Sequence, residues 1–187
     1  QELKQTESPK PEIPAPPKLA IPQVPFADIT SQAGIDFVHQ NGATGDKLLP
    51  ETMGGGCAFF DFDNDGDQDL LLINSANWNH SSSFDRPSPG QTSSTHALYE
   101  NDGHGQFRNA TVGSGLDVSF YGMGVAVGDY DNDGFIDVFI SSLHSNHLYR
   151  NLSGSGKFED VTAVAGVSGD SNAWSTSCGW FDYDNDG

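Results

Sequence analysis

The sequence predicts an all-β fold composed of β-propeller blades. Three observations predict it: glycine is abundant, at 22 of 187 residues, no segment keeps a helical period, and one series of short elements recurs along the chain. A repeat of about 50 to 70 residues with several short strands is typical of a propeller blade, whose faces are buried only when neighbouring blades pack on them. The chain holds about two and a half such repeats.

The most specific repeat is a run of small residues that leads into an aspartate-rich loop, at residues 54–66, 122–134 and 175–187. A second element, which begins with phenylalanine and ends in a small residue, glycine and an aliphatic residue, recurs at 26–35, 107–116 and 158–167. A third, Leu-Tyr-x-Asn, occurs at 98–101 and 148–151. Because the order is the same each time, we expect one structural unit to be repeated.

The segments between these anchors predict strands and loops. Residues 70–73 and 138–140 are short apolar runs that directly follow an aspartate loop, which favours β-strands. Residues 74–97 are rich in polar residues and predict an insertion that lengthens the first repeat.

The ends of the chain differ in composition from the repeats. Residues 1–25 contain seven of the ten prolines and predict a disordered, extended spacer, or else a frayed terminus without a role. We therefore place the partial propeller at 26–187, and read the chain as a fragment because the third copy stops at Gly187.

Charge restricts the classes of partner. The net charge is −18 and the pI about 4.2, so nucleic acid and anionic membrane surfaces would be repelled, whereas cations would be attracted. A membrane span is not expected, because no apolar run reaches about 18 residues. Cys57 and Cys178 are too few for a disulfide framework, and we expect both to be buried free thiols.

The aspartate loops predict metal sites. Each complete loop, at 61–69 and 129–137, reads D-x-D-x-D-G-x-x-D, and a third begins at 182–187. Clustered carboxylates repel one another by about 4 kcal/mol per pair at about 4 Å and an effective dielectric near 20, so a cation should neutralise them. Calcium fits best, because it accepts 6 to 8 oxygen ligands in flexible geometry, whereas magnesium requires a stricter octahedron.

The predicted ligands are the aspartates of the three loops: Asp61, Asp63, Asp65, Asp67, Asp69, Asp129, Asp131, Asp133, Asp137, Asp182, Asp184 and Asp186. A helix-flanked EF-hand is disfavoured, because its position 12 requires glutamate and is Leu72 or Ile140 here. The remaining alternative is an acidic surface turn that binds nothing. Extracellular calcium modules often bind at about 10⁻⁴ to 10⁻³ M, which favours an exported protein whose signal peptide has been removed.

These motifs, together with the Glu-Thr-Met-Gly-Gly-Gly stretch at 51–56, resemble FG-GAP/VCBS-repeat proteins similar to cartilage acidic protein. The resemblance covers residues 26–187. It implies a propeller related to the integrin α head, usually of seven blades, with calcium in hairpin loops on one face and an extracellular, cell-surface or periplasmic location. It also implies a backbone carbonyl ligand at position 7 of each loop, from Asp67 or Phe135, and further blades that complete the ring.

The function that follows is a calcium-binding scaffold for adhesion to, or binding of, a protein or glycan. No catalytic residues are predicted, because no nucleophile elbow, phosphate-binding glycine loop or Cys-His pairing is present. The alternative is the propeller part of a secreted polysaccharide-degrading or other carbohydrate-active enzyme. Asn79, Asn109 and Asn151 are glycosylation acceptors by sequence, but the last two lie in repeat elements, which favours a structural role.

Overall fold

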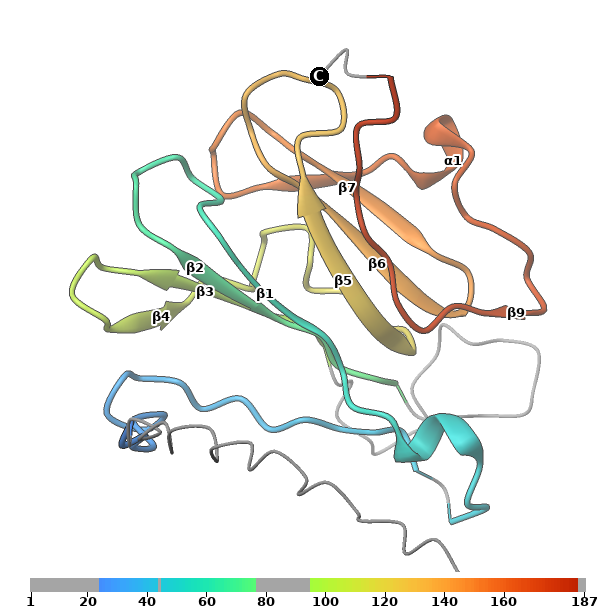
Figure 1. Cartoon of the computed structure of the whole chain (residues 1–187), viewed down its shortest axis with the longest axis horizontal. Coiled ribbons are helices and arrows are strands. Elements are labelled where there is room, and N and C mark those ends of the chain that lie inside the picture. Colours follow the sequence, from blue (N-terminus) through green and yellow to red (C-terminus); the bar gives the residue numbers. More distant parts are fainter. Residues whose placement is uncertain (1–23, 44, 77–94, 185–187) are drawn as a thin grey trace, which may run out of the picture.

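The computed structural model describes residues 24–43, 45–76 and 95–184, and it contains two antiparallel sheets that lie side by side (Figure 1). The first sheet has the order β1 (Cys57–Phe60), β2 (Asp69–Leu72), β3 (Ala97–Asn101), β4 (Phe107–Asn109). The second has the order β5 (Gly122–Gly128), β6 (Asp137–His144), β7 (His147–Asn151), β8 (Phe158–Asp160), with the short β9 (Ala173–Trp174) paired to β6. The predicted all-β class is confirmed.

Helical structure is limited to two single turns in the described part of the chain, η1 (Leu49–Thr52) before β1 and α1 (Thr162–Ala165) after β8. Neither is long and apolar enough to cross a membrane. The apolar runs that follow the aspartate loops form β2 and the start of β6, as predicted.

The two sheets have equivalent strands, so each is one blade. In blade 1, β2 pairs with β3 so that Leu70 faces Tyr99, and in blade 2, β6 pairs with β7 so that Val138 faces Tyr149. The ends of the predicted insertion at 74–97 belong to blade 1, because Asn74 and His96 are buried, while residues 77–94 lie outside the described part.

The main hydrophobic core lies between the two blades. Phe60 from blade 1 and Phe158 from blade 2 are buried there, with ring centroids 6.4 Å apart. Leu116, from the connection between the blades, is fully buried in the same core. Burial of each such side chain contributes about 1.5–3 kcal/mol, so the shared core stabilises both blades.

The first strands of successive repeats lie side by side. The Gly56 N–H donates a hydrogen bond to the Met123 carbonyl, 2.7 Å away, and a Cβ at Gly56 would lie 3.2 Å from the Gly124 Cα. A Cβ at Gly124 would in turn lie 3.1 Å from the Ser177 Cα. Glycine is needed where these backbones approach so closely.

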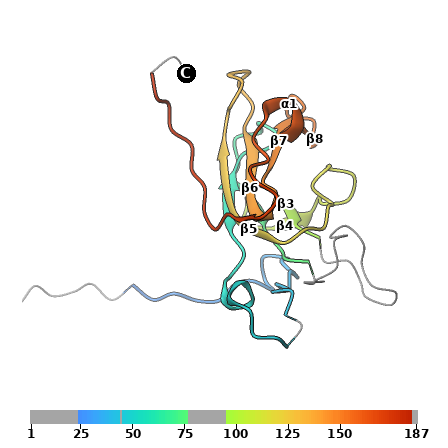
Figure 2. The same ribbon diagram turned by 90° about the vertical axis from the view of Figure 1, so that its right-hand side faces the viewer.

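Figures 1 and 2 show the third copy, in dark red, running along β5. Residues 175–184 form no strand in the described part, and Trp180 packs edge-on against Phe139, with centroids 6.0 Å apart. The three copies are therefore arranged in sequence order as neighbouring propeller blades are, in an open array over the described residues.

The second repeated element connects each blade to the next. The Phe107 N–H donates to the Ala33 carbonyl at 2.7 Å, and the Phe158 N–H donates to the Ser114 carbonyl at 2.6 Å. Ala33 and Ser114 occupy the same place in their repeats, so the connection into blade 1 is equivalent to the connection into blade 2.

The prediction for the cysteines was half right. Both thiols are free, but Cys57 is exposed and Cys178 only partly buried. Side chains alternate along β1, and Phe60 faces blade 2, so Cys57 and Phe59 lie on the opposite, uncovered face.

Candidate metal centres

The first aspartate of each loop folds the loop. The Asp61 carboxylate accepts hydrogen bonds from the Asp65 and Gly66 N–H groups at 3.0 and 2.9 Å. Asp129 accepts the same pair of bonds, from Asp133 and Gly134, at 3.0 and 2.8 Å. The glycines have positive φ, 98° and 89°, which an L-side chain would resist. The two loops thus share one backbone conformation.

The ninth residue braces the loop from inside. The buried Asp69 carboxylate accepts the Phe62 N–H at 3.0 Å and the Asn101 N–H at 2.8 Å. In blade 2 the buried Asp137 accepts the corresponding N–H groups, from Tyr130 at 2.9 Å and Asn151 at 2.7 Å. These aspartates tie the loop to the third strand of the same blade.

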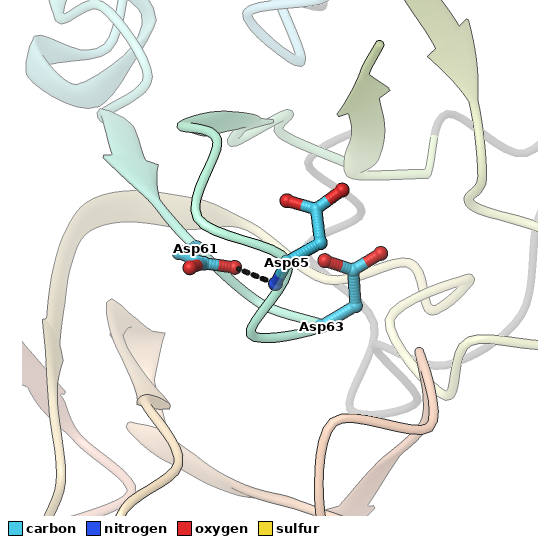
Figure 3. A group of neighbouring side chains, drawn as sticks. All are labelled: Asp61, Asp63 and Asp65. Carbon is cyan, nitrogen blue, oxygen red and sulfur yellow. Dashed lines mark hydrogen bonds between the residues drawn. The ribbon is translucent and has the colours of Figure 1, made fainter. Parts of the chain in front are cut away.

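In each loop three carboxylates converge. Oxygens of Asp61, Asp63 and Asp65 all lie within 4.8 Å of one another (Figure 3). In the second loop the converging oxygens belong to Asp129, Asp131 and Asp137. Ligands about 2.4 Å from a calcium ion are at most about 4.8 Å apart, so each trio is compact enough to share one cation.

The other predicted ligands lie around these trios. Asp69 and Asp133 are outside the converging sets, Asp67 has its carboxylate against Gly103, and the Phe135 ring lies against Gly154. In the third copy, Asp182 and Asp184 are exposed and line a cleft of about 360 Å³ shared with Asp129 and Trp180, while Asp186 lies outside the described residues.

The electrostatics of the first loop favour a cation. Asp63 Oδ1 is buried and has no hydrogen-bond donor in the described structure. Burial raises the Asp63 pKa, and the nearby Asp65 and Glu100 carboxylates raise it further. Burial also raises the pKa of Asp69 to about 6 and raises that of Asp137. A bound cation would give Asp63 Oδ1 a partner and would stabilise the charged forms of these buried carboxylates. The residues therefore fit calcium.

Residues of the Leu-Tyr-x-Asn element also contribute to the loops, which sequence reasoning missed. The buried Asn151 amide donates to the Phe62 carbonyl at 2.8 Å and the Ile136 carbonyl at 3.1 Å, joining the two loops. This confirms the structural role expected of Asn151. Asn109 belongs instead to the phenylalanine element at 107–116, where it is exposed and accepts the Thr111 N–H at 3.0 Å. Recurrence of Leu-Tyr-x-Asn in both repeats was the available signal for Asn151.

The third residue of the same element differs between the blades. In blade 1 it is Glu100, which forms an ion pair with Arg108 and acts electrostatically on Asp63. In blade 2 it is Arg150, whose Nε lies 3.1 Å from Asp131 Oδ2 and whose Nη2 lies 3.9 Å from Asp133 Oδ2. The two candidate metal centres therefore have one backbone and different charges.

Comparison with known families agrees with these repeats. The family model for the FG-GAP-like repeat matches twice, at residues 61–140 and 129–187, and each match begins at the first aspartate of a loop. Comparison with curated proteins gave no significant match. The two family matches together cover more than half of the chain. The chain thus belongs to the FG-GAP-like repeat family.

Proposed function

We propose that the protein is a calcium-binding scaffold of the β-propeller type, in which calcium fixes the hairpin loops of successive blades. The observation that carries the proposal is the repeated convergence of three carboxylates in a loop of fixed backbone, at equivalent positions of two neighbouring blades. The β1–β2 and β5–β6 loops lie on the same side of the molecule (Figure 1).

Calcium is the proposed ion because the donors are three converging carboxylates at the tip of a hairpin. Calcium accepts monodentate carboxylates, carbonyls and water together, and tolerates irregular geometry. Asp61 and Asp65 also accept backbone hydrogen bonds that hold the turn. Each hydrogen-bonded oxygen has a second lone pair, which can bind a cation. Asp63, with its orphaned oxygen, is the strongest ligand candidate.

We further propose export, followed by binding of an extracellular protein or glycan, without catalysis by this chain. The support is the expected weak affinity of the loops, which matches extracellular calcium concentrations. The kinship to cartilage acidic protein and to the integrin α head, and further blades beyond this chain, belong to the same proposal and rest on the sequence resemblance. The carbohydrate-active enzyme stays the rival, and turnover of a polysaccharide panel by the chain would favour it.

Calcium titration tests the proposal directly. Chelator-treated protein is titrated by calorimetry while its thermal unfolding is followed with and without calcium. Near-stoichiometric binding at the two complete loops, with a raised melting temperature, supports the proposal. Asp63→Asn and Asp131→Asn should each remove one site.

The matched control is Asp117→Asn, which changes the charge equally at an exposed aspartate outside the loops. Among the described residues its carboxylate accepts a hydrogen bond from the Gly113 N–H, which an amide oxygen can also accept. Absence of binding at millimolar calcium, or equal loss of binding in the control, contradicts the proposal.

A further inference from the structure

We infer that Arg150 is an internal cation of the second loop, which competes with calcium there and makes the two loops unequal. The first loop then binds calcium more tightly than the second, which binds the ion only as the guanidinium leaves. This inference rests on the proposed function, because it describes how the same two centres are regulated. It requires that Glu100 and Arg150 occupy equivalent positions in the third strands of their blades. It also requires that the charges near the two loops differ.

The equivalence of the two places follows from the sheets. Glu100 and Arg150 each precede an asparagine whose N–H donates to the bracing aspartate, Asn101 to Asp69 and Asn151 to Asp137. Each follows the tyrosine that pairs with the strand leaving the loop. The two side chains therefore begin at the same point relative to their loops.

The Arg150 guanidinium pairs with the second loop, although Glu159 on the neighbouring strand is another possible partner. Arg150 stands opposite Glu159 in the β7–β8 ladder, as Glu100 stands opposite Arg108 in the β3–β4 ladder. Glu100 does pair with its cross-strand partner. Arg150 instead has ion pairs with Asp131 and Asp133.

Composition reinforces the contrast. The first loop has five aspartates, including Asp67 at position 7, and Glu100 behind it. The second has four aspartates, Phe135 at position 7, and Arg150 behind it. A calcium ion approaching the second loop meets fewer carboxylates and a fixed positive charge, and it must take Asp131 from the guanidinium.

The Arg150 side chain can leave the loop. It is 42% exposed, and its long stem can turn the charged group into water or toward Glu159 at low cost. Without metal, Arg150 therefore partly neutralises the carboxylates of the second loop. When calcium binds there, it replaces the guanidinium. The first loop has no such substitute in the described structure, so its order depends more strongly on calcium.

The test isolates each loop in the full chain. Asp63→Asn leaves only the second loop complete, and Asp131→Asn leaves only the first; the double variant supplies the blank for residual binding at the third copy. Calorimetry with calcium chloride measures each dissociation constant, with and without Arg150→Gln. Arg108→Gln, which removes an equal charge in blade 1, is the matched control.

We expect the second loop to bind more weakly than the first, and Arg150→Gln to tighten it about tenfold, as removal of one repelling charge near the ion predicts. Arg150→Glu, which copies blade 1, should tighten it further. The first loop should change less than about twofold with Arg150→Gln, and Arg108→Gln should leave the second loop unchanged. Thermal melts without calcium confirm that the variants fold.

Two outcomes separate the inference from the proposed function. If the Asp63→Asn protein binds calcium but Arg150→Gln leaves or weakens that affinity, Arg150 does not compete and the inference is overturned, while calcium binding stands. If neither single-loop protein binds calcium, the proposed function fails, and the inference with it.

Discussion

The aspartate loops of the two blades use the same backbone hydrogen bonds, yet different side chains stand behind them. Asp61 and Asp129 close the turns, and Asp69 and Asp137 brace them, with nearly the same distances in both blades. Glu100 pairs with Arg108 and raises the pKa of Asp63 in the first loop, whereas Arg150 is paired with the second loop. Loop shape and loop charge are therefore set by separate residues, and a substitution can change one without the other.

The largest expected effect concerns the blade faces. Leu116 is fully buried between the two blades. Leu116→Ala should lower the free energy of unfolding by about 3–4 kcal/mol, because the substitution leaves a cavity. Ile35 is its equivalent on the outer face of blade 1 and is only half-buried, so Ile35→Ala should cost about 1 kcal/mol. Urea denaturation measures both. Equal losses would show that the outer face is as well covered as the inner one.

The next effect tests whether the braces are alike. Asp69→Ala and Asp137→Ala each strand two backbone N–H groups, and should each cost about 2–3 kcal/mol in chelator. The loss should be smaller than the sum for two unpaired N–H groups, because removing the carboxylate also removes the cost of burying its charge. Denaturation with chelator separates this effect from metal binding. A loss confined to one blade would break the equivalence of the loops.

A pH effect distinguishes the blades at the opposite end of the strands. Burial, with repulsion from His147, lowers the pKa of His96 to about 3 from 6.5, whereas Asn146 holds the equivalent position in blade 2. The neutral ring accepts the Asn74 N–H at 3.1 Å. Because the unfolded chain binds the proton first, the stability due to His96 is complete above about pH 6.5 and is lost as the pH falls toward 3.

Compared with His96→Asn, the natural protein should therefore lose about 1 kcal/mol more stability per pH unit below pH 6.5. Taking the difference between the two proteins cancels the opposite contribution of Asp69, whose raised pKa stabilises the folded state at low pH. Parallel curves for the two proteins would contradict the burial of a neutral His96.

The smallest effect concerns the Glu100–Arg108 pair. Arg108 is 71% exposed, so Arg108→Gln should change the free energy of unfolding by less than about 0.5 kcal/mol. A loss of several times that value, measured in chelator, would contradict the small contribution expected of an exposed ion pair.

The parts of the fold that sequence predicts are those encoded locally. The D-x-D-x-D-G pattern specifies a tight turn with converging carboxylates, and the apolar run from Leu70 specifies the strand after it. Their recurrence predicted equivalent blades, and the neighbouring positions of Gly56, Gly124 and Ser177 agree. The all-β class and the loop geometry followed without tertiary information.

What sequence could not supply depends on strand register. Arg150 is distant from Asp131 along the chain, and only the β6–β7 pairing brings them together. The exposure of Cys57 depends on which face of β1 the next blade covers. The dual role of Asp69, ligand candidate and brace, likewise required the β3 backbone. The Glu-to-Arg change within Leu-Tyr-x-Asn was visible, but its consequence was not.

The most direct measurement is anomalous diffraction from crystals grown with calcium. We expect one ion among Asp61, Asp63 and Asp65 and one among Asp129, Asp131 and Asp137, with Arg150 turned away from Asp131 wherever the second ion is bound. Absence of ions from both loops, or a fully occupied second site with the Arg150–Asp131 ion pair intact, would contradict this expectation.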